Sequence, residues 1–70
     1  MAFLMNVTIN GFSKEISDGQ SLSLVVAHFC RQPKSIIAEV NGQIITAKDW
    51  SSTHLKEGDK IELVAFVGGG

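Results

Sequence analysis

The last three residues, Gly68, Gly69 and Gly70, are the strongest candidates for chemistry in this sequence. Glycine has no side chain, so three in a row neither pack into a core nor stabilise a strand. They can enter a slot that any Cβ would block, and they present the terminal carboxylate of Gly70 without steric cover. Residues 67–70 reach roughly 13 Å when extended, at about 3.3 to 3.6 Å per residue. The pattern predicts a tail that delivers its end to a partner; a frayed terminus or linker stub is the alternative.

Other reactive side chains give weaker signals. Cys30 has no second cysteine or basic pair nearby to activate its thiol, so we interpret it as a small packed hydrophobe rather than a sulfur relay. His28 and His54 lack a ligand set at metal spacing, and we predict no metal site. A lone cysteine also excludes an internal disulfide, which favours a cytoplasmic location for so small a domain.

Length and charge limit the possible functions. Seventy residues, 44% hydrophobic and 19% charged, predict one small globular domain with little room for a deep pocket, so we expect no enzyme activity. Six Lys and Arg against seven Asp and Glu form no cationic stripe, so nucleic acid is not expected as a partner. Because no apolar run reaches membrane-spanning length and no basic leader is present, we expect no membrane partner.

Hydrophobic spacing predicts two hairpins around one helix. Residues 3–9 alternate as a half-buried strand, Asn10-Gly11 favours a type I′ turn, and residues 12–16 return as an edge strand. Ser21 is placed as a helix N-cap. The helix that follows is expected to end before Pro33 and to bury a stripe made of Leu22, Val25, Val26 and Phe29.

The second half repeats the hairpin and adds a final strand. Residues 36–40 and 43–45 flank Asn41-Gly42, and residues 46–55 predict an irregular segment with one short helical turn. After a turn at Gly58, residues 60–66 predict the last strand, with Ile61, Leu63 and Ala65 on one face and Glu62, Val64 and Phe66 on the other.

This order predicts an α+β fold of the β-grasp type. The sheet would be mixed and four- to five-stranded, with one helix packed across one face and the last strand beside the first in the centre. Residues 1–67 would form the domain and residues 68–70 a flexible glycine tail. Val64, Phe66, Val67 and Ile37 are the predicted docking residues for a partner, and a covering loop or an oligomer contact is the alternative.

Several motifs together resemble a known family. They are Val7-Thr8-Ile9-Asn10-Gly11, Asp18-Gly19, Val40-Asn41-Gly42, Lys48-Asp49-Trp50, Leu55-Lys56-Glu57-Gly58-Asp59 and Phe66-Val67-Gly68-Gly69-Gly70. In order and spacing they are similar to the ThiS family, the sulfur carriers of thiamine biosynthesis, which are ubiquitin-like β-grasp proteins. The sequence departs from the family at Thr46-Ala47, where a Pro-Arg pair is common, and at Ala65, where a basic residue often stands.

The resemblance implies a function for the tail. A ThiF-type, E1-like adenylyltransferase would use ATP and Mg²⁺ to adenylate the carboxylate of Gly70, with Gly68 and Gly69 threading into its active site. A cysteine desulfurase persulfide would supply sulfur, and the resulting thiocarboxylate would serve a thiazole synthase of the ThiG type. The chain itself would bind no cofactor and have no catalytic residue. The small subunit of molybdopterin synthase and a non-covalent ubiquitin-like interaction domain are the alternatives.

Overall fold

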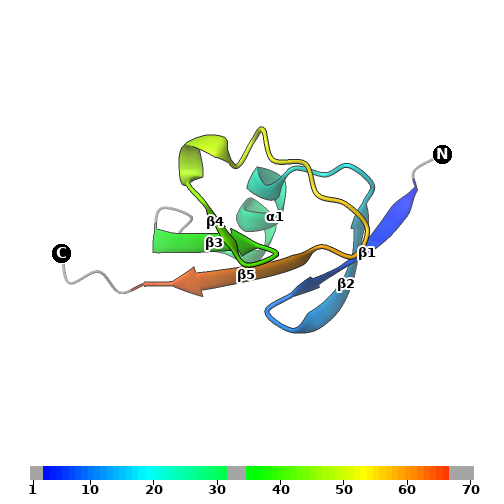
Figure 1. Cartoon of the computed structure of the whole chain (residues 1–70), viewed down its shortest axis with the longest axis horizontal. Coiled ribbons are helices and arrows are strands. Elements are labelled where there is room, and N and C mark those ends of the chain that lie inside the picture. Colours follow the sequence, from blue (N-terminus) through cyan, green and yellow to red (C-terminus); the bar gives the residue numbers. More distant parts are fainter. Residues whose placement is uncertain (1–2, 32–34, 67–70) are drawn as a thin grey trace.

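The computed structural model describes residues 3–31 and 35–66. Its elements are β1 (Leu4–Ile9), β2 (Phe12–Ser17), α1 (Leu22–Phe29), β3 (Ile36–Val40), β4 (Gln43–Ile45), the 3-10 turn η2 (Ala47–Asp49) and β5 (Lys60–Ala65). The sheet has five strands in the order β2-β1-β5-β3-β4. β5 pairs parallel to β1 and antiparallel to β3. The helix α1 lies on one face of the sheet (Figure 1). The predicted ubiquitin-like β-grasp fold is confirmed, with five strands.

Both hairpins turn through the predicted Asn-Gly pairs. The φ angles are 52° at Asn10 and 84° at Gly11, and 53° at Asn41 and 85° at Gly42. Positive φ at both central residues is the requirement of a type I′ turn, whose twist matches that of the strands it joins. A Cβ built on either glycine would meet no atom within 4 Å, so the backbone conformation is what requires glycine there.

The helix begins as predicted and ends early. Ser21 is the N-cap, and its Oγ accepts a hydrogen bond of 3.3 Å from the amide of Leu24. Leu22, Val25 and Val26 are buried, whereas Phe29, expected on the same stripe, is 41% exposed. The helix stops at Phe29 because Cys30 is extended, with φ −129° and ψ 133°. Pro33, the predicted stop signal, lies outside the described residues.

The core lies between α1 and the sheet. Its buried residues are Met5, Val7, Ile9, Ile16, Leu22, Val25, Val26, Ala38, Trp50, Leu55, Ile61 and Leu63. The segment that follows β4 arches over the same side (Figure 1), and its Trp50 donates its indole N–H to the Ile45 carbonyl at 2.8 Å. This segment contains the short helical turn predicted from the sequence.

The short helix leaves both ends of the sheet uncovered. At 1.5 Å per residue its eight residues span roughly 12 Å, whereas a six-residue strand such as β5 spans roughly 20 Å. Ala65, predicted on the same strand face as the buried Ile61 and Leu63, is therefore exposed, and Phe3 and Phe12 are exposed as well. Within the described part of the chain, no helix is long and apolar enough to cross a membrane.

Candidate functional site

The central strand β5 leads directly to the C-terminal glycines. Residues 67–70, which include Val67, Gly68, Gly69 and Gly70, lie outside the described residues. The tail and the boundary at residue 67 therefore stay predictions. The described chain reaches Phe66, whose amide donates a 2.9 Å hydrogen bond to the Ser35 carbonyl beside β3. The structure therefore shows how β5, the strand that precedes the tail, is held in the sheet.

Asn10 extends the pairing between β1 and β5. The parallel register joins only Thr8 to Lys60 and Ile9 to Ile61. Asn10 follows, and its amide donates to the Ile61 carbonyl at 2.9 Å. Its side chain continues the pairing: Oδ1 accepts from the Leu63 amide at 2.7 Å, and Nδ2 donates to the Leu63 carbonyl at 3.2 Å. These part-buried bonds hold β5 where β1 has already turned away.

Asn41 has the corresponding position on the other side of β5. Its Oδ1 accepts from the Lys60 amide at 2.9 Å, and its own amide donates to the Lys60 carbonyl at 2.7 Å. Its Nδ2 donates to Asp59 Oδ1 at 3.0 Å. The two turn asparagines thus hold β5 from both hairpins. Sequence reasoning identified the turns and missed this second role, for which the only signal was asparagine at the same turn position twice.

Two of the predicted docking residues meet on the face of the sheet that α1 does not cover. Ile37 of β3 and Val64 of β5 are directly opposite each other in the antiparallel register, and both are exposed. The register also brings Ile44 of β4 to this side, opposite Glu39. We call Ile37, Glu39, Ile44, Glu62 and Val64 the open face. Ile37 and Val64 are thus cross-strand neighbours, and their role in docking stays a prediction.

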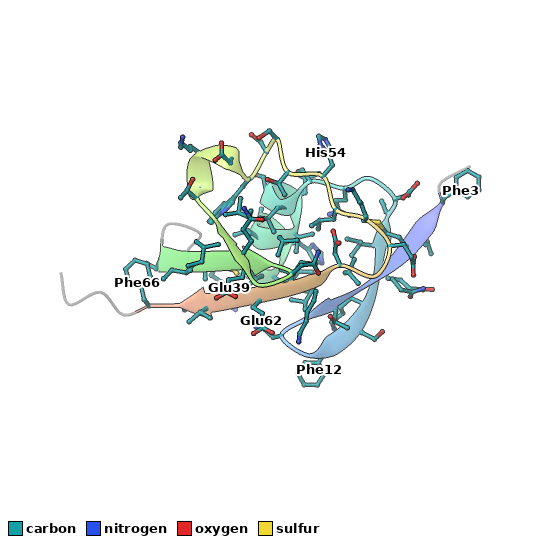
Figure 2. The ribbon with its side chains drawn as sticks, viewed as in Figure 1. Phe3, Phe12, Glu39, His54, Glu62 and Phe66 are labelled. Atoms are coloured by element: carbon teal, nitrogen blue, oxygen red, sulfur yellow. The ribbon has the colours of Figure 1, made fainter. Side chains whose placement is uncertain are left out.

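The centre of the open face holds two glutamates that sequence reasoning did not single out. Glu39 and Glu62 are directly opposite each other across β3 and β5 and lie side by side in Figure 2. Like charges in such a cross-strand pair destabilise a sheet. The pair therefore destabilises the isolated chain, and a cation from a partner placed beside the two carboxylates would reduce this repulsion.

Phe66 lies apart from the open face. The sequence predicted that it would share a face with Val64, but β5 ends at Ala65 and strand alternation no longer applies beyond it. Phe66 instead lines an open groove of about 740 Å³ together with Leu63 and Ala65, on the helix side of the sheet. The described docking candidates therefore divide between two surfaces, with Ile37 and Val64 on the open face and Phe66 at the groove.

Cys30 is half-buried against the core at the end of α1. Burial raises the pKa of its thiol, so less reactive thiolate is present near neutral pH. This agrees with the interpretation of Cys30 as a packed hydrophobe. His28 and His54 are both exposed, and no group of three His, Cys, Asp or Glu within residues 3–31 and 35–66 could hold a metal ion.

Comparison with known proteins identifies the family. A model of the ThiS family matches residues 7–70, a span that includes the three terminal glycines. The chain belongs to the ThiS family. The ThiS crystal structure from Geobacter metallireducens, a thiamine biosynthesis protein, superposes with a TM-score of 0.83 at 26% identity, covering 94% of this chain and all of that one. A solution structure of a thiamine biosynthesis protein from the same organism gives 0.75 at 28% identity, covering 94% and 88%.

Two curated relatives extend the comparison. The thiazole synthase of Paramagnetospirillum magneticum is 27% identical over 66 residues, which are 94% of this chain but 20% of that protein. The chain thus spans about a fifth of that relative. The ycf40 protein of Porphyra purpurea is also 27% identical over 66 residues, covering 94% of this chain and 93% of that protein. Together, family and neighbours support a sulfur carrier role in thiamine biosynthesis.

Proposed function

We propose that this protein carries sulfur for thiazole formation as a thiocarboxylate on Gly70, acting as a co-substrate of partner enzymes rather than as an enzyme. The observation that carries this proposal is the ThiS family match, which runs through the folded body to the terminal glycines. The fold supports it, since the central strand β5 leads to those glycines and is held from both hairpins.

The chemistry requires activation because a carboxylate is a poor electrophile. A carboxylate oxygen of Gly70 attacks the α-phosphorus of ATP, the bond from that phosphorus to its bridging oxygen breaks, and pyrophosphate leaves, which gives the acyl adenylate. The terminal sulfur of a protein persulfide then attacks the acyl carbon and AMP departs, which leaves an acyl disulfide. A second thiol cleaves the S–S bond and frees the thiocarboxylate. ATP and Mg²⁺ are bound by the activating enzyme, and no side chain of this chain takes part.

The proposed partners are a ThiF-type adenylating enzyme, a cysteine desulfurase that supplies the persulfide, and a ThiG-type thiazole synthase. The relative named thiazole synthase supports the last of these, because a region similar to 94% of this chain forms part of that protein. Joining two modules in one chain raises their effective concentration for each other.

The folded body must help to bind these partners. Ordering each tail residue costs about 1 to 2 kcal/mol of backbone entropy, and more for glycine. We assign the offsetting contacts first to the open face, where the apolar Ile37, Ile44 and Val64 surround the Glu39–Glu62 pair. A partner surface with aliphatic side chains and one basic residue would fit this arrangement.

Intact-mass spectrometry tests the proposal directly. The full chain is incubated with the ThiF-type enzyme, Mg-ATP, a cysteine desulfurase, cysteine and a thiol reductant. We expect the mass change of one oxygen replaced by sulfur at the C-terminus, and none in a variant that lacks Gly69 and Gly70. Recovery of only the unmodified carboxylate from the full chain would contradict the proposal. Binding to a molybdopterin synthase large subunit instead of thiazole synthase would favour the alternative carrier.

A further inference from the structure

The groove beside the end of β5 is an exposed apolar surface separate from the open face. Three phenylalanines from separate elements line it: Phe12 at the start of β2, Phe29 at the end of α1, and Phe66 after β5. They are 70%, 41% and 47% exposed. Ile36 and Leu63 contribute to its lining. Figure 2 shows Phe12 at the start of β2 and Phe66 beyond the end of β5, at different edges of the molecule. Several exposed aromatic side chains along one groove are typical of an interaction surface.

The charged side chains among the described lining residues of the groove are all positive. Lys14 and Arg31 belong to its lining, and no Asp or Glu is among the described residues that form it. The Nζ atom of Lys14 lies 5.9 Å from the centroid of the Phe29 ring, a distance at which a cation is attracted to an aromatic face. One ammonium group is thus positioned over one of the aromatic side chains that a ligand would contact.

The groove is separate from the open face in position and in charge. Ile37 and Val64 are absent from its lining, which lies on the helix side of the sheet. The open face has two carboxylates at its centre, whereas the groove has two cations. A segment that complements one surface would be repelled by the other.

We propose that the groove is a second docking surface, which takes a segment of a partner protein carrying an apolar or aromatic side chain next to a carboxylate. The segment lies along the groove with its apolar side chain packed against the phenylalanine rings that line it, and its carboxylate pairs with Lys14 and Arg31. The volume of about 740 Å³ lies within the range of roughly 300 to 1,000 Å³ usual for sites that enclose small groups. The proposal rests on the proposed function only in naming the partner enzymes.

Binding measurements with charge-reversed variants test this docking surface. The full chain, the double variant Lys14→Glu with Arg31→Glu, and Phe12→Ser are titrated separately into the ThiF-type enzyme and into thiazole synthase by calorimetry. The matched controls are Lys56→Glu, an exposed cation in the turn before β5, and Leu24→Ser, an exposed apolar residue of α1. Circular dichroism melts check that each variant is folded, which we expect because every substituted side chain is exposed.

We expect both groove variants to lose about tenfold or more in affinity for at least one of the two enzymes, and the controls to stay within about twofold. Equal affinity of groove variants and full chain for both enzymes would overturn the proposal. So would sedimentation showing that the full chain self-associates at the assay concentration and that the groove variants do not, since the occupant would then be a second copy.

The two proposals fail in different ways. If the full chain gains sulfur while the groove variants bind both enzymes normally, the groove proposal is overturned and the carrier function stands. If the groove variants lose affinity but the full chain never gains sulfur, the groove stands and the carrier function is overturned. Binding of the full chain to neither enzyme would overturn both, since the groove would then have no partner segment among them.

Discussion

The open face and the groove lie on opposite sides of one sheet and differ in both chemistry and shape. The open face is aliphatic around Glu39 and Glu62, whereas the groove is aromatic around Lys14 and Arg31. A carrier must visit more than one enzyme, and opposite charges let a small domain distinguish its partners without additional elements. A chain with a net charge of −1 can therefore present two surfaces of opposite charge.

The difference has a structural cause. Among residues 3–31 and 35–66, no element forms a second layer over the open face, so side chains there follow the alternation of β3, β4 and β5. The groove exists because α1 covers only part of the other face and ends at Phe29. One surface therefore depends on strand register and the other on helix length.

The largest expected effect comes from a charge placed on the open face. Val64→Asp should lower kcat/KM of the ThiF-type enzyme for this chain by roughly 30-fold, because a central apolar contact is worth about 2 kcal/mol. Pyrophosphate release measures this rate. Leu24→Asp, an exposed apolar position on α1, is the control and should stay within about twofold. If Val64→Asp is activated normally, the open face is not the docking surface for this enzyme.

The next largest effect is expected in the stability of the fold, when the side chain of Asn10 is removed. Asn10→Gly keeps the positive φ of the turn but removes two hydrogen bonds to the Leu63 backbone, and Leu63 stands between the two surfaces on β5. We expect the free energy of unfolding to fall by about 1 to 2 kcal/mol. Urea denaturation measures it. Asn41→Gly is the matched control, and its more exposed bonds should cost less. An equal loss in both variants would show that Asn10 has no special role.

A smaller effect of opposite sign is expected at the glutamate pair. Glu39→Gln should raise the free energy of unfolding by a few tenths of a kcal/mol and at most about 1, because it removes repulsion from Glu62. The same change should weaken binding through the open face and leave binding through the groove unchanged. Thermal melting and calorimetry give the two readouts. Glu15→Gln on the edge strand β2, where Asn6 is opposite, should change neither. Destabilisation by Glu39→Gln would contradict the repulsive pair.

The smallest effect concerns Cys30, which lines the groove. Because burial raises the pKa of its thiol, alkylation by iodoacetamide at pH 7 should be slower than for free cysteine and should accelerate as the pH rises toward that pKa. A partner bound in the groove should slow the reaction further, whereas one bound at the open face should not. Labelling faster than that of free cysteine at pH 7 would show an activated thiol.

The local elements were predictable because each depends on a few neighbouring residues. Both Asn-Gly turns, the Ser21 cap and the positive φ of Gly58, 85°, follow from backbone sterics or a short-range hydrogen bond. The β-grasp order followed from these elements in sequence. The predictions for Phe29 and Phe66 were wrong. These residues lie at the ends of α1 and β5, where packing by distant segments decides whether an apolar side chain is buried.

By itself the sequence determined the turns, the strand periods, the start of the helix and membership of a family defined by motifs through Gly70. Only the tertiary structure decided that Glu39 stands opposite Glu62, that Asn10 holds Leu63, and that Phe66 lines the groove. The physical reason is the separation along the chain over which each interaction acts. Steric and periodic preferences act within one turn or strand, whereas strand register and helix coverage come from packing segments that are distant in the chain.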